Sequence, residues 1–92
     1  MPKLNRAQIK TAIASTPEWK LIPGSAIRRT FVFKDFVVAI RFVTRVAKIA
    51  EKAWHHPDID IRWNKVTLTL STHSEGGLTT KDFNLAKQFD QL

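Results

Sequence analysis

The chain has 92 residues, 43% of them hydrophobic and 25% charged, with a formal net charge of +7 and no cysteine. This composition is typical of a single folded domain spanning residues 1–92, and it excludes disulfides and every metal site that depends on cysteine. No apolar run approaches the roughly 20 residues that cross a bilayer, and the first ten residues lack the apolar segment of a secretory signal, so we expect a cytoplasmic protein with no membrane partner.

The positive charge is concentrated in the first half of the chain. Residues 1–50 hold ten Lys and Arg against Glu18 and Asp35, a net of +8, whereas residues 51–92 have a net of −1. Such asymmetry fits a nucleic-acid or membrane-surface binder, and it equally fits a solvated basic helix face. We favour the solvated face and expect no direct nucleic-acid binding.

The first elements form a helix followed by a hairpin. Asn5 is a good N-cap, and apolar residues at helical spacing predict a short amphipathic helix over residues 5–15. Residues 19–22 and 26–33 alternate as two strands, joined by a turn in which Gly24 can supply a positive φ. Arg29 interrupts the alternation of the second strand, as a residue at a sheet edge can.

The longest predicted element is a helix from Asp35, its expected N-cap, to about Trp54. Its predicted buried stripe consists of Phe36, Ile40, Val43, Ala47 and Ala50. Its exposed stripe carries basic side chains, namely Arg41, Arg45, Lys48 and Lys52.

Two more strands and a final helix follow Pro57. Residues 58–63 and 66–71 alternate, and Asn64 with Lys65 forms the expected tight turn, with Asn64 tolerating the left-handed conformation. His73 then falls at the end of a strand, residues 74–77 form a flexible loop, and Thr79 with Asp82 fits a capping box. The final helix carries Phe83, Leu85, Ala86 and Phe89 toward the core.

Consecutive hairpins with helices between them predict an α+β fold of two layers, with a four-stranded antiparallel sheet and three helices on one face. The order of elements is α-β-β-α-β-β-α. A domain of this size buries a thin core, so a second copy of the chain can supply further burial.

The three histidines, His55, His56 and His73, lie near two junctions between elements and can converge. Because histidine gains and loses protons near neutral pH, such a cluster favours acid-base chemistry or metal binding, although a helix C-terminus also attracts isolated histidines. A tri-histidine zinc site is the weaker alternative, because adjacent histidines on a helix point about 100° apart. We expect no metal.

The sequence resembles the pterin-4a-carbinolamine dehydratase family. The resemblance is carried by FKDF at 33–36 and by the run from Phe42 to Ala86, with Trp19 also at a position where the family has tryptophan. Its most specific parts are Glu51, Lys52, His55, His56, Pro57, Asn64, the segment LSTH at 70–73, Gly77, Leu78 and Asp82. Ile59 and Trp54 depart from the family, which often has tryptophan at the first position and a polar residue at the second.

The resemblance implies an enzyme without cofactor that dehydrates 4a-hydroxytetrahydropterin to quinonoid dihydropterin and water. It also implies a homodimer or homotetramer, and an aromatic amino acid hydroxylase as the pathway partner that produces the pterin substrate. The residues implied as catalytic are His55, His56 and His73. Those implied as substrate-binding are Trp54, His55, His56, Ser71, Thr72, His73 and Ser74, and those supporting the site are Glu51, Pro57 and Asp82.

The chemistry of these residues agrees with that reaction. Loss of water from C4a needs an acid for the leaving oxygen and a base for a ring-nitrogen proton, and histidine serves as either. Glu51, one helical turn before His55, is expected to orient His55 or favour its protonated form, and Asp82 to do the same for another histidine. A second hypothesis is a non-enzymatic protein-interaction module, since an animal relative of the family is also a dimerisation cofactor of a homeodomain transcription factor.

Overall fold

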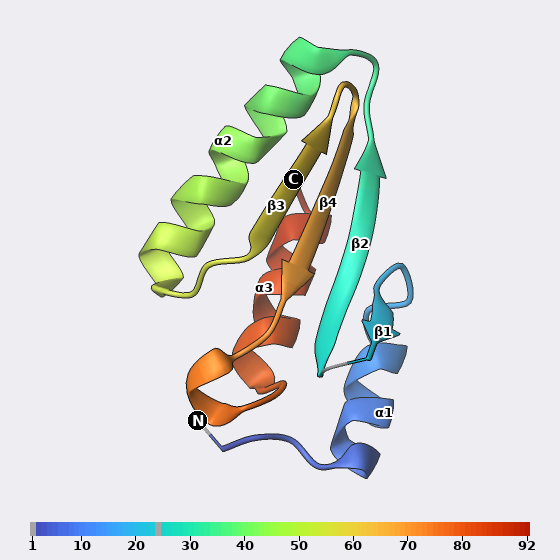
Figure 1. Ribbon diagram of the computed structural model, residues 1–92, viewed down its shortest axis with the longest axis vertical. Helices are drawn as coiled ribbons and strands as arrows, with labels where there is room; N and C mark the ends of the chain where they lie inside the picture. The colour runs from blue at the N-terminus through green and yellow to red at the C-terminus, as the bar shows by residue number, and fades with distance from the viewer. Residues whose placement is uncertain (1, 24) are drawn as a thin grey trace.

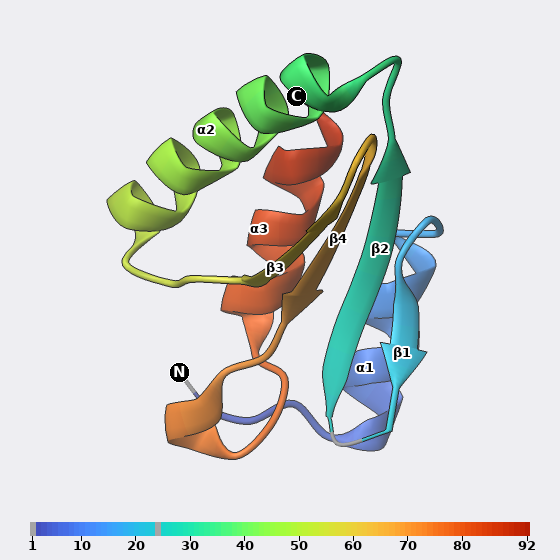
Figure 2. The same cartoon turned by 45° about the horizontal axis from the view of Figure 1, so that its top comes forward.

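A computed structural model of the chain describes residues 2–23 and 25–92. The elements are α1 (Arg6–Ala14), β1 (Lys20–Ile22), β2 (Ala26–Val32), α2 (Phe36–Ala53), β3 (Asp58–Arg62), β4 (Lys65–Leu70), the 3-10 helix η1 (His73–Glu75) and α3 (Thr80–Asp90). The strands form one antiparallel sheet in the order β1-β2-β4-β3, with the helices on one of its faces (Figure 1, Figure 2). The predicted α+β fold and element order are confirmed, while the turn predicted at Gly24 lies outside the described residues.

The predicted helix starts are confirmed, because each has a side chain that accepts from a free backbone N–H of the first turn. The Asn5 side chain accepts from the Gln8 amide at 2.8 Å, and the Gln8 side chain accepts from Asn5 N–H at 2.8 Å. Asp35 caps α2 through the Val38 amide at 2.9 Å, and Thr79 and Asp82 form the capping box of α3. Local sequence therefore fixes where these helices begin.

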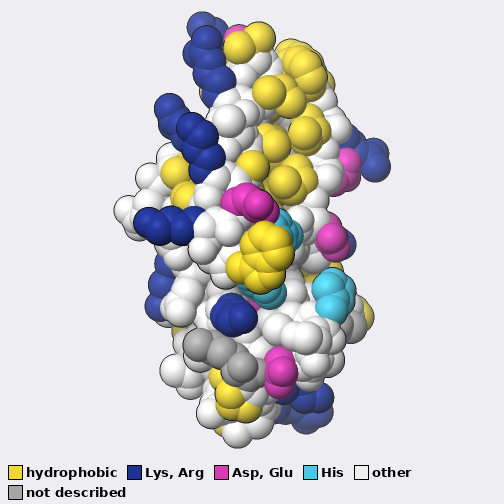
Figure 3. Space-filling model, turned by 90° about the vertical axis from the view of Figure 1, so that its left-hand side faces the viewer, with side chains coloured by type: hydrophobic (Ala, Val, Ile, Leu, Met, Phe, Trp, Pro, Cys, Tyr) yellow, Lys and Arg dark blue, Asp and Glu magenta, His cyan; other side chains and the backbone are white. Residues whose placement is uncertain are grey.

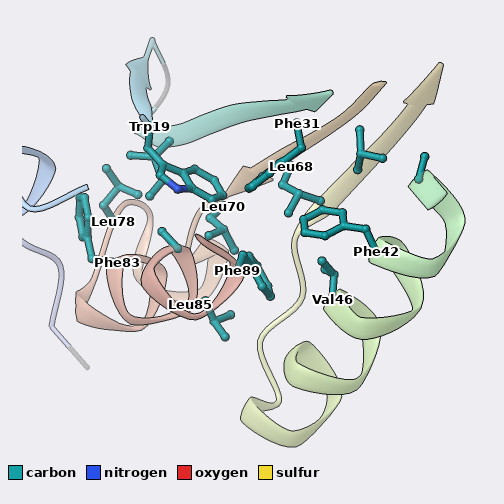
Figure 4. Close-up of a cluster of buried hydrophobic side chains, with 14 residues drawn as sticks. Trp19, Phe31, Phe42, Val46, Leu68, Leu70, Leu78, Phe83, Leu85 and Phe89 are labelled. Carbon is teal, nitrogen blue, oxygen red and sulfur yellow. The ribbon is translucent and has the colours of Figure 1, made fainter. Parts of the chain in front are cut away.

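The core lies between the inner face of the sheet and the helices α2 and α3 (Figure 4). All four apolar residues predicted to face inward from α3 are buried. In α2 the buried residues are Ala39, Phe42, Val46 and Ala50. Of the predicted stripe, Ala50 is buried and Ile40 and Val43 are partly buried, so the prediction is wrong at the exposed Phe36 and Ala47. Apolar residues cover more than one stripe of α2, and helical periodicity cannot distinguish which of two neighbouring stripes the sheet will contact.

Arg29 does not occupy a sheet edge, because β2 lies between β1 and β4. Its guanidinium instead pairs with the Asp90 carboxylate of α3 and lies 4.1 Å from the centroid of the Phe31 ring. Trp19 donates from Nε1 to the same Asp90 oxygen at 2.8 Å. Arg29 thus interrupts the apolar pattern because it ties the sheet to the last turn of α3.

The tight turn between β3 and β4 lies one residue earlier than predicted. Trp63 and Asn64 form the turn, and Trp63, with φ 53°, takes the left-handed conformation expected of Asn64. Asn64 uses its side-chain amide to donate to the Phe33 carbonyl at 2.8 Å. Asn64 therefore joins this turn to the residue after β2, while Trp63 supplies the left-handed conformation of the turn.

The basic residues predicted on the exposed stripe of α2 are exposed, as expected. Figure 3 shows Lys and Arg side chains along one side of the molecular surface and apolar side chains along another. Among the helices of the described residues, none combines the length and the apolarity needed to cross a membrane.

Candidate active site

The end of α2 determines where the adjacent histidines point. Trp54 takes a left-handed conformation with φ 53°, and the amide of His55 then donates to the Ala50 carbonyl at 3.1 Å. This conformation costs a residue with a Cβ atom about 1–2 kcal/mol. It ends the helix before both histidines, so helical spacing no longer decides the direction of either ring.

His55 turns inward to the start of α3. Its Nε2 lies 2.6 Å from Oδ1 of Asp82, and the two side chains are 12% and 0% exposed. An ionised carboxylate only accepts hydrogen bonds, so Nε2 of His55 carries the donated proton. This contact fixes the ring orientation and leaves Nδ1 as the nitrogen that can exchange a proton with a ligand.

The carboxylate of Asp82 is held by two further groups of the chain. Its Oδ2 accepts from the Thr72 hydroxyl at 2.8 Å and from the Thr79 amide at 3.0 Å. The hydroxyls of Thr72 and Thr79 are 2.9 Å apart, and since Thr72 uses its hydrogen on Asp82, Thr79 donates to Thr72. Both carboxylate oxygens are thereby satisfied, as a fully buried carboxylate requires.

His56 turns outward and meets the other carboxylate. Its Nε2 lies 2.6 Å from Oε1 of Glu51, with the side chains 53% and 66% exposed. The His56 ring also contacts the Trp54 ring edge to face, with centroids 5.5 Å apart. The predicted pairing of Glu51 with His55 is therefore wrong, and Asp82 is the carboxylate that orients His55.

His73 lies beyond the strand on which it was predicted. β4 ends at Leu70, and His73 is the exposed first residue of η1. The loop predicted at residues 74–77 is folded: η1 occupies its start, Gly76 has φ 71°, and Thr72 pairs with Gly77 as an isolated bridge. These contacts hold the backbone of His73 next to buried Thr72, and therefore close to Asp82.

The other predicted site residues divide into exposed and supporting groups. Ser74 is exposed beside His73, and the Ser71 hydroxyl donates to the Ser25 carbonyl at 3.0 Å. Thr72, expected among the binding residues, is 5% exposed with its hydroxyl committed to Asp82. Pro57 connects the histidines to β3.

Thr79 also belongs to the hydrogen-bond network around Asp82, although the sequence predicted it only as a helix cap. Its hydroxyl also bonds Thr72, which makes it part of the support of Asp82 and His55. The signal that could have identified it is the capping box itself, because the same box fixes the position of the Asp82 carboxylate.

The histidine side chains gather in the middle of one face of the molecule, with carboxylates and an exposed apolar side chain among them (Figure 3). The arrangement provides imidazole groups on an accessible surface, one of them fixed by a buried carboxylate. Within residues 2–23 and 25–92, no group of three or more His, Asp or Glu side chains is placed to hold a metal ion.

The fold and this site define a small α+β protein with a histidine cluster between the end of its long helix and the start of its last. The sequence profile of the Pterin 4 alpha carbinolamine dehydratase family matches residues 2–92. The chain belongs to this family.

Similar proteins span nearly the same length. The chain is 52% identical over 92 residues to a protein of Chloroflexus aurantiacus, covering 100% of this chain and 98% of that protein. It is 54% identical over 89 residues to one of Roseiflexus castenholzii, covering 97% and 95% respectively. Both relatives are provisionally named pterin-4-alpha-carbinolamine dehydratases.

A solved structure has the same fold. The crystal structure of a transcriptional coactivator/pterin dehydratase from Brucella melitensis superposes with a TM-score of 0.92 at 37% identity, covering 97% of this chain and 96% of that one. The name of that protein joins an enzyme activity to a role in transcription.

Proposed function

We propose that this chain, acting as one domain in the cytoplasm, dehydrates 4a-hydroxytetrahydropterin to quinonoid dihydropterin and water. The reaction would recycle the tetrahydrobiopterin used by an aromatic amino acid hydroxylase. The observation that carries the proposal is His55, fixed through Nε2 by the buried Asp82 carboxylate at 2.6 Å beside a second, accessible histidine. Membership of the pterin-4a-carbinolamine dehydratase family supports the choice of substrate.

The reaction needs two proton transfers and no redox step. An acid protonates the hydroxyl oxygen as the C4a–O bond breaks and water leaves. A base accepts the proton of ring nitrogen N5 as the C4a=N5 double bond forms. We assign His55 and His73 as this acid-base pair, with His56 binding the substrate or assisting.

Other side chains hold the pterin or the histidines. The proposed binding residues are Trp54, His55, His56, Ser71, His73 and Ser74. Because the Thr72 hydroxyl is buried against Asp82, we assign Thr72 to the support of the site together with Asp82, Pro57 and Glu51. Glu51 acts on His56, since their side chains are in contact.

The test is the decay of enzymatically generated 4a-hydroxytetrahydropterin, followed by ultraviolet absorbance. The wild type should accelerate the decay, and His55→Ala and His73→Ala should each lower kcat by about 10²–10⁴-fold, the usual contribution of one acid-base group. His56→Ala is the matched control beside them and should lower kcat by less. Circular dichroism checks that each variant folds. A folded wild type that gives no acceleration would overturn the proposal.

A second candidate function is a protein-interaction module without catalysis. It is favoured by the name of the Brucella melitensis neighbour, which includes transcriptional coactivator. The two functions separate in cells that lack the chromosomal gene, because an interaction module should still work with His55→Ala and His73→Ala. A phenotype that neither histidine variant rescues favours the enzyme.

We also propose that the chain assembles as a homodimer or homotetramer. β3 is an edge strand of the sheet, and four large apolar side chains of α2 and β3 are at least about one third exposed, namely Phe36, Val37, Ile59 and Ile61. Such a surface on a small protein is typical of an interface. Light scattering should give two or four times the 10.5 kDa chain mass, and a monomer would contradict this.

A further inference from the structure

A second cavity lies away from the histidines, between α1 and β1, and is called here the α1–β1 groove. Its volume is about 720 Å³, within the range of about 300–1,000 Å³ that is typical of small-molecule sites. The two elements lie beside each other at one end of the molecule (Figure 1, Figure 2). β1 and β3 are opposite edges of the sheet, so the oligomer interface proposed at β3 leaves this groove open.

The floor of the α1–β1 groove is apolar. Ile9 and Ile13 of α1 are half-buried and pack against the core, and Leu78 is fully buried. Leu21 of β1 also lines the groove and is 53% exposed. Because no residue of α1 is fully buried, the apolar side of this helix is only partly covered by the rest of the chain. The groove therefore offers aliphatic surface that a ligand can remove from water.

Three cationic side chains line the same groove, namely Lys3, Arg6 and Lys10, and its described lining residues include no acidic one. All three are exposed, and none of the salt bridges among the described residues includes them. Arg6 and Lys10 are one helical turn apart, so their charges repel. Arg6 also lies in the first turn of α1, where the helix dipole disfavours a cation. These charges therefore reduce the stability of α1.

Lys3 is placed at the groove by contacts with the segment before α3. The amide of Leu4 donates to the Leu78 carbonyl at 2.8 Å. The aliphatic stem of Lys3 lies against Gly77, where an added Cβ atom would come within 2.7 Å of Cδ of Lys3. The first segment of the chain thus adds a third cation to the two on α1, around one apolar floor.

We propose that the α1–β1 groove binds a free fatty acid, with its carboxylate at Lys3, Arg6 and Lys10 and its alkyl chain on the apolar floor. Cations without an acidic partner complement an anionic head group, and a guanidinium can hold a carboxylate through two hydrogen bonds. An alkyl chain suits an aliphatic floor better than a peptide, whose backbone polar groups would lose hydrogen bonds there. No histidine lines the groove, so this inference does not depend on the proposed function.

The test is a titration of the ¹⁵N-labelled protein with decanoate below its micelle-forming concentration, followed by amide chemical shifts. Saturable shifts are expected within residues 3–13 and 20–22. Neutral decyl glucoside, which lacks the charge, and acetate, which lacks the chain, should each bind at least about 10-fold more weakly. Equal binding of either compound overturns the proposed ligand class. Shifts confined to other residues overturn the site, and binding only to anionic phospholipid vesicles indicates a membrane surface and overturns the proposal.

A double variant tests the head-group contacts. Arg6→Gln with Lys10→Gln should raise the Kd for decanoate about 10-fold. Lys48→Gln with Lys52→Gln is the matched control, because it removes two exposed cations at the same spacing on α2, and it should leave the Kd unchanged. Removing the repulsion within α1 should keep or increase the melting temperature, so weaker binding would not reflect unfolding. A folded double variant with the wild-type Kd overturns the proposal.

A second pair of variants tests the floor. Leu21→Ser should raise the Kd for decanoate about 5-fold, because the alkyl chain loses apolar contact. Val32→Ser is the control, since Val32 is a strand residue that is 65% exposed and does not line the groove. An equal Kd for Leu21→Ser and the wild type, or an equal rise in both variants, would show that the chain does not lie on this floor.

Discussion

The adjacent histidines occupy two opposite environments. Each places Nε2 2.6 Å from one carboxylate oxygen, His55 on Asp82 and His56 on Glu51. The first pair is 12% and 0% exposed, and the second is 53% and 66% exposed. The two histidine–carboxylate pairs therefore have the same N–O distance but differ in burial, in their neighbours and in their access to water.

This difference teaches that a hydrogen-bond length does not measure a contribution to stability. An exposed ion pair is weakened by solvent screening and by the entropy of ordering two mobile side chains, so it contributes at most about 1 kcal/mol. A buried carboxylate that loses one partner keeps its desolvation penalty, which makes the change costly. The substitutions below test the difference between the buried and the exposed pair.

The largest effect on stability is expected for Asp82→Asn. An amide has one acceptor oxygen, but three groups donate to Asp82: the His55 ring, the Thr72 hydroxyl and the Thr79 amide. The free energy of unfolding should fall by about 2–4 kcal/mol, measured by urea denaturation. Asp58→Asn, at an exposed strand position, is the control. A loss below about 1 kcal/mol would show that burial does not distinguish the two pairs.

A smaller loss is expected for Thr72→Val, which removes one donor to Asp82 and retains the shape of the side chain. The variant should lose about 1–2 kcal/mol of unfolding free energy, because one carboxylate lone pair is left buried without its hydroxyl. Thr44→Val is the matched control, since the Thr44 hydroxyl is exposed and donates to the Ile40 carbonyl. Thermal denaturation of both variants checks the difference, and equal losses would contradict it.

The smallest effect is expected for Glu51→Gln. Its exposed contact with His56 should contribute about 0.5 kcal/mol or less to the free energy of unfolding. Urea denaturation in 1 M NaCl should abolish even this difference, because the screening length falls to about 3 Å. The Asp82→Asn loss should persist in the same salt. A Glu51→Gln loss as large as that of Asp82→Asn would refute the comparison.

The sequence determined the elements and the family. Caps at Asn5, Asp35 and Thr79 fixed the helix starts because each cap acts over three or four residues, and alternation identified the strands for the same local reason. FKDF at 33–36 and the run from Phe42 to Ala86, which includes the histidine motifs, were sufficient to place the chain in its family. Helix caps, strand alternation and sequence motifs depend on residues close together in the chain, so they can be predicted without knowledge of the tertiary structure.

Only the tertiary structure decided which carboxylate meets which histidine. Helical spacing predicted Glu51 against His55, but that spacing applies only while the helix continues, and the left-handed Trp54 ends it one residue too early. His55 then reaches Asp82, 27 positions along the chain, because α2 and α3 pack on the same face of the sheet. The buried stripe of α2 and the Arg29–Asp90 pair were settled in the same way, by packing between elements that no local pattern encodes.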